Sequence, residues 1–211
     1  MMRRFRDAGD ASYGSAPRQR RGYDAGMPTL LFVCTGNLCR SPMAATVARN
    51  VLAGRTEAVN VISAGLLRPG EPATDEAVNV MGRRGLDLST HRSRRVGDVL
   101  VPAPDLIVGM ARQHARAVVD VMPGLFPRTF TLKDFLVRAR SEGPRRPGEA
   151  LDTYLARVGM DRGFGALVGS SSADDVADPI GCDLRTYERC AAEIEAAVTS
   201  LIDLVWPDTV S

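Results

Sequence analysis

Short apolar runs alternate along the chain with longer segments of helical periodicity. Four runs have the length of buried strands, at about residues 29–33, 59–63, 105–108 and 128–131. Three segments with apolar residues on one face fall between them, at about residues 41–53, 72–82 and 113–121. This alternation predicts an α/β fold, in which helices cover both faces of a parallel sheet.

The clearest helical period lies near the C-terminus. Its apolar side chains are spaced alternately by three and four: Leu184, Tyr187, Ala191, Ile194, Val198, Leu201 and Val205. The region 141–177 is harder to interpret. A short helix is expected around Leu151 to Val158, and the Gly- and Ser-rich stretch 163–172 predicts a loop. That loop is either a mobile flap leading to Asp178 or a featureless surface segment.

One octapeptide carries most of the candidate chemistry. It lies between the first predicted strand and the first predicted helix: Cys34-Thr35-Gly36-Asn37-Leu38-Cys39-Arg40-Ser41. Backbone N–H groups of a tight loop and of a helix N-terminus converge there and favour a bound anion. The pattern therefore predicts a phosphate-binding loop directly after the first strand.

Side chains of this loop predict nucleophilic attack at phosphorus. Cys34 is expected to be a thiolate, because a helix N-terminus and cationic neighbours favour the ionised, nucleophilic form. The guanidinium of Arg40 can bind two phosphoryl oxygens and spread the charge of the transition state. Ser41 is placed to donate a hydrogen bond to the sulfur. Gly36 permits the turn, and Asn37 either holds the loop by side-chain hydrogen bonds or adopts a left-handed conformation.

The sequence Val-Cys-Thr-Gly-Asn-Leu-Cys-Arg-Ser-Pro-Met-Ala resembles the loop of the low-molecular-weight protein tyrosine phosphatase family. The resemblance spans about residues 29–205 and includes Ile62-Ser63-Ala64-Gly65 and Asp178-Pro179. It implies a four-stranded sheet of order 2-1-3-4 with the phosphate loop after strand 1. It also implies that the substrate is bound by Thr35, Gly36, Asn37, Leu38, Cys39 and Ser41.

The resemblance also implies roles outside the loop. Asp178 would protonate the leaving group and then, as a base, activate the water that hydrolyses a phosphocysteine on Cys34. Ser63 would support the loop through a hydrogen bond to Asn37. These assignments predict a protein-tyrosine-phosphatase-type hydrolase.

Other polar residues are expected to be structural. Neither a metal nor a cofactor is expected, since the two histidines, His91 and His114, lie in separate segments without a ligand cluster. Each is expected to be structural or on the surface. Asp174 and Asp175 are nearby alternatives to the acid Asp178, and they are expected to be solvated loop residues.

The substrate class is less sharply determined. Eukaryotic-type members carry aromatic residues after Asp-Pro that sandwich the phosphotyrosine ring, whereas Ile180-Gly181-Cys182 follows here. Thr35, the segment Phe130-Thr131-Leu132-Lys133 and the Asp-Pro-x-Gly arrangement resemble bacterial members, which include protein arginine phosphatases. A bacterial-type phosphotyrosine phosphatase is the favoured interpretation, and a protein arginine phosphatase is the alternative.

Two further classes are disfavoured. Thioredoxin-coupled arsenate reductases need two cysteines before the Asp-Pro pair, whereas Cys182 and Cys190 follow it and are expected to be buried helix cysteines. A non-catalytic phosphate-recognition module is disfavoured because Cys34, Arg40 and Asp178 are all present.

Cys39 leaves two possibilities open. It either only packs the loop, or it forms a disulfide with Cys34 that protects the nucleophile from irreversible oxidation.

Composition sets the remaining expectations. Residues 1–26 are rich in arginine and have almost no large apolar residues, which predicts a disordered tail. The chain of 211 residues, 45% apolar and 25% charged, suits a single domain over residues 27–211. A net charge of +2 implies no nucleic-acid partner, and no apolar run is long enough for a membrane span. Four cysteines without regular spacing indicate a reducing cytoplasm. A monomer acting on a phosphorylated protein is expected.

Overall fold

The computed structural model describes residues 26–167 and 172–208. The predicted disordered tail, except for Gly26, lies outside these described residues, as does part of the predicted loop at 163–172.

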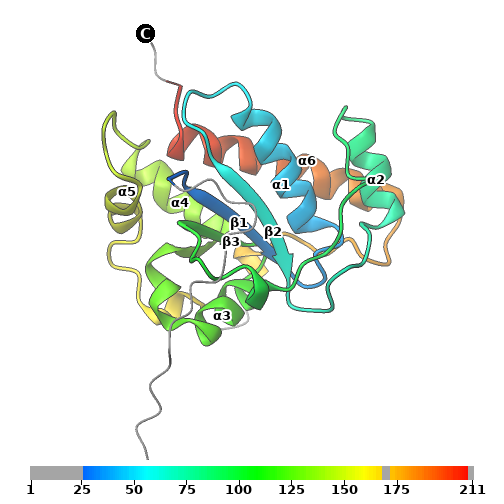
Figure 1. The fold of residues 1–211 in the computed structure, drawn as a ribbon, viewed down its shortest axis with the longest axis horizontal. Coiled ribbons are helices and arrows are strands. Elements are labelled where there is room, and N and C mark those ends of the chain that lie inside the picture. Colours follow the sequence, from blue (N-terminus) through cyan, green and yellow to red (C-terminus); the bar gives the residue numbers. More distant parts are fainter. Residues whose placement is uncertain (1–25, 168–171, 209–211) are drawn as a thin grey trace, which may run out of the picture.

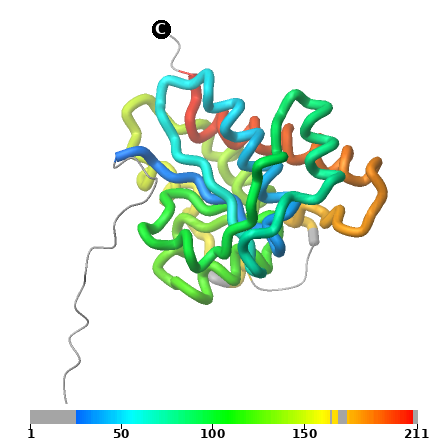
Figure 2. Tube along the Cα trace, turned by 45° about the vertical axis from the view of Figure 1, so that its right-hand side comes forward, coloured from blue at the N-terminus to red at the C-terminus, as the bar shows by residue number. Residues whose placement is uncertain are grey.

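A parallel sheet forms the centre of the described chain (Figure 1). Its strands are β1 Thr29–Cys34, β2 Asn60–Gly65, β3 Leu106–Gly109 and β4 Thr129–Thr131. Their order, β2-β1-β3-β4, confirms the predicted order 2-1-3-4. In Figure 2 the blue β1 runs between the cyan β2 and the green β3, so the loop after β1 lies at the switch in strand order.

Helices cover both faces of this sheet, as predicted. They are α1 Arg40–Leu52, α2 Asp75–Gly82, α3 Arg112–Val121, α4 Leu132–Glu142, α5 Leu151–Val158 and α6 Leu184–Val205. Short 3₁₀ turns span Val96–Asp98, Pro123–Arg128, Phe164–Leu167 and Ser172–Asp174. In Figures 1 and 2, α6 runs beside α1 on one face, while α3 lies on the other.

Alternate residues of β1 divide the core into two layers, because successive strand side chains point to opposite faces. Leu30 and Phe32 pack with the buried residues of α1 and α6. Leu31 and Val33 pack with Val118 of α3 on the opposite face. Both ends of the loop that follows β1 are therefore anchored in a fully packed interior.

Helix α4 was not predicted from the sequence. Its buried residues Leu132, Phe135, Leu136 and Ala139 have helical spacing, and Thr131 caps the helix by accepting a hydrogen bond from the Asp134 N–H, at 3.2 Å. The helix starts directly after β4, without a Gly or Pro to separate the two elements. The boundary is therefore hidden in a continuous apolar run.

Candidate active site

The phosphate loop connects the carboxyl end of β1 to the first residue of α1. Cys34 is the last residue of β1 and is 1% exposed. Its Sγ accepts hydrogen bonds from the Asn37 backbone N–H at 3.2 Å and from the Ser41 hydroxyl at 3.0 Å. Both donors favour negative charge on the sulfur. Cys34 and Arg40 therefore lie at opposite ends of one short turn.

Asn37 holds the loop from its centre. Its φ of 57° is left-handed, and its Nδ2 donates hydrogen bonds of 2.9 Å to both Ser41 Oγ and Ser63 Oγ. Its Oδ1 accepts a hydrogen bond from the Arg94 backbone N–H, also at 2.9 Å. Both possibilities stated for Asn37 from the sequence therefore hold at once, and Ser63 lies where the resemblance implies.

Gly65, the last residue of β2, lies directly against the loop backbone. An added Cβ would lie 2.7 Å from Asn37 N, 2.8 Å from Gly36 C and 2.9 Å from Thr35 O. Real Cβ atoms essentially never come closer than 3.0 Å to such neighbours. Only glycine allows the loop to pack at this distance from β2.

Arg40 and Asp178 meet at the mouth of the loop. Arg40 is 3% exposed, and its guanidinium forms an ion pair with the Asp178 carboxylate and donates to the Val176 carbonyl at 3.1 Å. Asp178 is brought there because the Val176 N–H donates to the Met110 carbonyl beyond β3, at 2.8 Å. Within the described chain, Arg40 Nε is buried and has no hydrogen-bond partner. The cation and the acid of the predicted site are therefore in direct contact.

Both histidines contact the phosphate loop, which the sequence did not indicate. His114 is fully buried in α3, with Nε2 2.9 Å from Thr35 Oγ1, and its pKa is lowered to about 4 by burial and by the charge of Arg40. His91 Nε2 lies 2.8 Å from the Asn37 carbonyl and must donate to it. Burial, opposed by this hydrogen bond, lowers the pKa of His91. No local pattern marks either residue, since tertiary packing brings both to the loop.

The cysteines differ sharply in environment. Cys39 is 1% exposed, and burial together with the charges of Cys34 and Asp178 raises its pKa to about 12. Cys190 is also buried, as predicted, and burial raises its pKa to about 12. The prediction of a buried Cys182 is wrong, because Cys182 lies in the exposed turn before α6 rather than on its inner face.

The prediction that Asp174 and Asp175 are solvated loop acids is also wrong. Asp174 forms an ion pair with Arg112, and its side chain is 25% exposed. Asp175 Oδ1 accepts a hydrogen bond from the Arg112 backbone N–H at 2.8 Å, at the start of α3. Both acids therefore fasten the segment before Asp178 to α3, where a carboxylate also suits the helix N-terminus.

Comparison with known proteins identifies this arrangement. A family profile described as low molecular weight phosphotyrosine protein phosphatase matches residues 29–144. The probable low molecular weight protein-tyrosine-phosphatase EpsP of Ralstonia solanacearum is 44% identical over 141 residues, which are 66% of this chain and 93% of that protein. The chain belongs to the low molecular weight phosphotyrosine protein phosphatase family. The predicted family and the predicted hydrolase class are thereby confirmed.

Other relatives of this phosphatase differ in the activity that they are named for. A protein-arginine-phosphatase of Bacillus subtilis (strain 168) is 31% identical over 126 residues, covering 59% of this chain and 83% of that protein. The crystal structure of a low molecular weight protein tyrosine phosphatase from T. tengcongensis has a TM-score of 0.63 and 29% identity, covering 83% of this chain and 98% of that one. The fold is therefore shared with solved members of the family.

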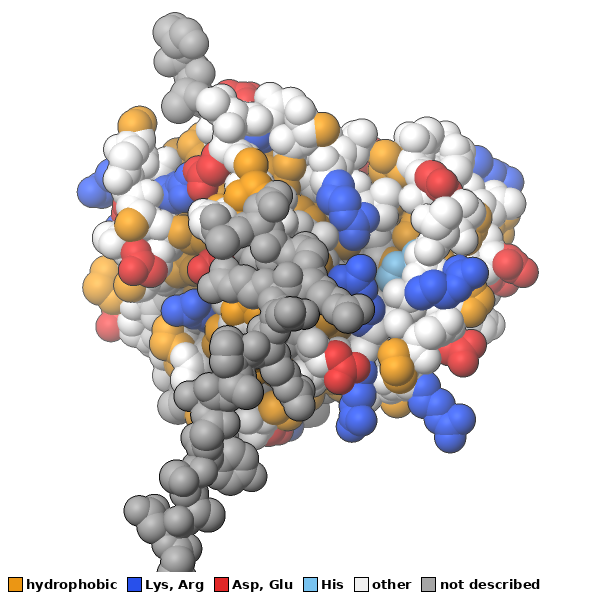
Figure 3. Space-filling view, viewed as in Figure 1, with side chains coloured by type: hydrophobic (Ala, Val, Ile, Leu, Met, Phe, Trp, Pro, Cys, Tyr) orange, Lys and Arg blue, Asp and Glu red, His pale blue; other side chains and the backbone are white. Residues whose placement is uncertain are grey.

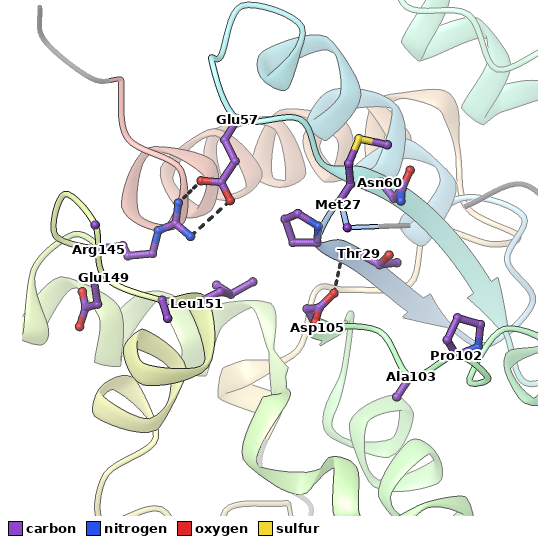
Figure 4. A pocket seen from close by; sticks show the side chains of 14 residues that line it. Met27, Thr29, Glu57, Asn60, Pro102, Ala103, Asp105, Arg145, Glu149 and Leu151 are labelled. Atoms are coloured by element: carbon purple, nitrogen blue, oxygen red, sulfur yellow. Dashed lines mark hydrogen bonds and ion pairs between the residues drawn. The ribbon is translucent and has the colours of Figure 1, made fainter. Parts of the chain in front are cut away.

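Two cavities of this phosphatase lie at opposite ends of the sheet. One, of about 570 Å³, adjoins the phosphate loop and is lined by Gly36, Leu38, Leu66, Leu67, Arg68, Pro69, Glu71 and Arg95. The other, of about 650 Å³, lies at the amino end of β1, where Glu57 pairs with Arg145 and Asp105 accepts from the Thr29 N–H at 2.8 Å (Figure 4). Of the two, only the first is lined by residues of the phosphate loop, Gly36 and Leu38. No cluster of three potential metal ligands occurs among the described residues.

Proposed function

We propose that this phosphatase hydrolyses phosphotyrosine in proteins, with Cys34 as nucleophile, Arg40 as phosphate ligand and Asp178 as acid and base. The observation that carries the proposal is the convergence of the three side chains. The Cys34 sulfur accepts two hydrogen bonds from the loop, and Arg40, at the other end of the same loop, forms an ion pair with Asp178. Thr35, Gly36, Asn37, Leu38, Cys39 and Ser41 would surround the bound phosphoryl group.

The first step transfers the phosphoryl group to sulfur. The Cys34 thiolate attacks phosphorus in line, so that an S–P bond forms while the P–O bond to the tyrosyl oxygen breaks. Asp178, protonated, gives its proton to that oxygen, and neutral tyrosine leaves. Arg40 and the loop N–H groups carry the charge that builds on the phosphoryl oxygens.

The second step returns the enzyme to its starting state. Asp178, now a carboxylate, takes a proton from a water molecule, whose oxygen attacks phosphorus as the S–P bond breaks. Inorganic phosphate and the thiolate are the products. The Ser41 hydroxyl, 3.0 Å from Sγ, stabilises the sulfur as it becomes a leaving group. Ser63 supports this geometry through Asn37, 2.9 Å away.

The cavity beside the loop favours an aromatic leaving group. Leu38, Leu66 and Leu67 offer an apolar surface to a phenyl ring, in place of the missing aromatic residues after Asp178. Arg68 and Arg95 line the same cavity and favour acidic residues beside a phosphotyrosine. The two arginines disfavour phosphoarginine, because they repel its cationic guanidinium. Among the lining residues, only Glu71 could offer that guanidinium an acidic partner.

We further propose that residues 27–211 act as one monomeric domain in the cytoplasm, on phosphorylated proteins and without a nucleic-acid, membrane or cofactor partner. All four cysteines are free thiols, which supports a reducing compartment. Among the described residues, no helix has the length and apolarity that crossing a membrane requires.

Matched peptides test the proposal. We expect kcat/KM for a phosphotyrosine peptide to exceed that for the phosphoarginine peptide of the same sequence by at least about 10-fold, equivalent to about 1.4 kcal/mol. The reverse order would refute the substrate assignment. Cys34→Ser should abolish turnover, whereas Cys182→Ser, at an exposed thiol, should retain it. Asp178→Asn should lower kcat about 10²-fold or more for phosphotyrosine, but less for an aryl phosphate whose leaving group needs no proton.

A further inference from the structure

A second concentration of positive charge lies beside the phosphate loop, in a pocket that shares no lining residue with the substrate cavity. Arg49 of α1 and His91, Arg92 and Arg94 of the segment between α2 and β3 line a pocket of about 350 Å³. Figure 3 shows Lys and Arg side chains gathered around a histidine at the surface.

Nearby acids do not balance this charge. Asp87 is the one acid among the residues that line the pocket, and its carboxylate accepts a hydrogen bond from the Ser89 backbone N–H at 2.8 Å. Within the described chain, none of Arg49, Arg92 and Arg94 forms an ion pair. By contrast, eight other described arginines are paired with Asp or Glu. The pocket therefore brings together three arginines that have no acidic partner among the described residues.

The cations also repel one another. Partial desolvation and the charge of Arg94 lower the pKa of Arg49. The charges of Arg49, Arg94 and Arg92 add to burial in lowering the pKa of His91. An anion bound between these side chains would reduce their electrostatic repulsion and favour their charged forms.

Hydrogen bonds to the protein use only part of the donor capacity of these side chains. Arg49 Nε donates to the Val61 carbonyl at 3.3 Å, and Arg49 Nη1 donates to Thr46 Oγ1 at 3.5 Å. Arg92 Nη1 donates to the His91 carbonyl at 2.7 Å. A guanidinium has five N–H donors in a planar fork, so each arginine keeps donors for oxyanion oxygens.

The pocket is connected to the nucleophile through Asn37. His91 donates to the Asn37 carbonyl at 2.8 Å, and the Arg94 N–H donates to Asn37 Oδ1 at 2.9 Å. Asn37 in turn donates its backbone N–H to Cys34 Sγ at 3.2 Å. A ligand that shifts His91 or Arg94 would therefore shift Asn37, which shapes the loop.

We propose that this basic pocket binds a phosphorylated small molecule and that its occupancy changes turnover at Cys34 through Asn37. Several cations in a small pocket suit a ligand with two or more phosphoryl charges. Arg94 and Arg95 are neighbours in an extended segment, and they line different pockets, the basic pocket and the substrate cavity. Ser93, which is hydrogen-bonded to Glu71 and Arg68 of the substrate cavity, lies between the two pockets, and this division favours a small molecule over a second phosphoryl group of the same peptide.

Calorimetric titration of the full chain with inorganic pyrophosphate tests the binding. We expect two sites in the wild type, the phosphate loop and the basic pocket. The double variant Arg49→Gln/Arg94→Gln should keep the first and lose at least 10-fold in affinity at the second. The control variant Arg140→Gln removes another exposed charge, whose guanidinium donates to Ser200 Oγ at 3.5 Å, and should keep both sites. A single site in the wild type, or two unchanged sites in the double variant, would overturn the proposal.

Steady-state kinetics test the coupling. Pyrophosphate in the phosphate loop competes with an aryl phosphate substrate and raises only KM, whereas pyrophosphate in the basic pocket should change kcat at least twofold and saturably. The double variant should lose the kcat effect and keep the KM effect. If it fails to fold, the exposed Arg92→Gln should weaken the kcat effect by itself. An unchanged wild-type kcat would refute the coupling.

A phosphotyrosine peptide with a second phosphoryl group provides the last comparison. The ratio of KM for this peptide to KM for the singly phosphorylated peptide should be the same in Arg94→Gln as in the wild type. If this substitution raised KM only for the doubly phosphorylated peptide, the pocket would be part of the substrate site and the small-molecule proposal would be wrong. The calorimetric result stands even if the enzyme prefers phosphoarginine, so the two proposals can fail separately.

Discussion

Replacing Gly65 by alanine tests how far catalysis depends on the fit between β2 and the phosphate loop. The added Cβ would lie 2.7 Å from Asn37 N, whereas ordinary contacts begin at 3.4 Å. The nearest atoms are loop backbone, which has no flexible side chain to turn aside. The loop must therefore move by about 0.7 Å, or the whole strand must yield.

The size of this shift sets the expected loss. A misplacement of about 1 Å in a reacting geometry costs about 10²-fold in rate, so we expect kcat/KM to fall by about 10- to 100-fold. This corresponds to about 1.4–2.7 kcal/mol of transition-state stabilisation. Overpacking should also lower the free energy of unfolding by about 1–3 kcal/mol.

Steady-state hydrolysis of an aryl phosphate, measured well below the melting temperature of each variant, checks the prediction. Gly97→Ala is the matched control, because an added Cβ there has nothing within 4 Å and its φ is not positive. Activity of Gly65→Ala within twofold of wild type would refute the argument that this contact shapes the loop.

Three further predictions concern stability. The pKa of His114 is about 4 in the folded protein, against an ordinary 6.5, so between these pH values only the unfolded chain takes up this proton. The free energy of unfolding should therefore fall by up to about 3 kcal/mol as the pH drops from 6.5 to 4. Urea unfolding should show a shallower decline for His114→Gln. Arg162 is 8% exposed and its guanidinium lies 4.0 Å from the Phe130 ring centroid, so Arg162→Ala should cost about 2–4 kcal/mol in the same assay. Asp175→Ala should cost about 1 kcal/mol by removing the acceptor at the start of α3, and thermal melting should show no comparable loss for the exposed Asp120→Ala.

Periodicity in the sequence predicts most of this fold. The seven apolar positions of the last helix all lie in α6, and the runs around Leu31 and Ile107 pair in the sheet as expected of buried strands. Strand order came from the resemblance, because periodicity does not say which strands are neighbours. Helix α4 was missed since no breaker separates it from β4.

The candidate site was predictable only where its residues are close in sequence. The residues from Cys34 to Ser41 form one local turn, so their spacing is informative. His91 and His114 reach the loop only through tertiary packing, and neither carries a motif. The exposed Cys182 shows the same limit, because a turn and the first residues of a helix cannot be distinguished by composition alone.

The ion pair between Arg40 and Asp178 makes the acid an intramolecular competitor of phosphate. A carboxylate tethered beside a guanidinium has an effective concentration that any free anion must overcome. A substrate can do so with the additional contacts of its leaving group, whereas inorganic phosphate has none to offer. The pairing therefore weakens the binding of inorganic phosphate, because Asp178 can replace the product at Arg40 as phosphate leaves.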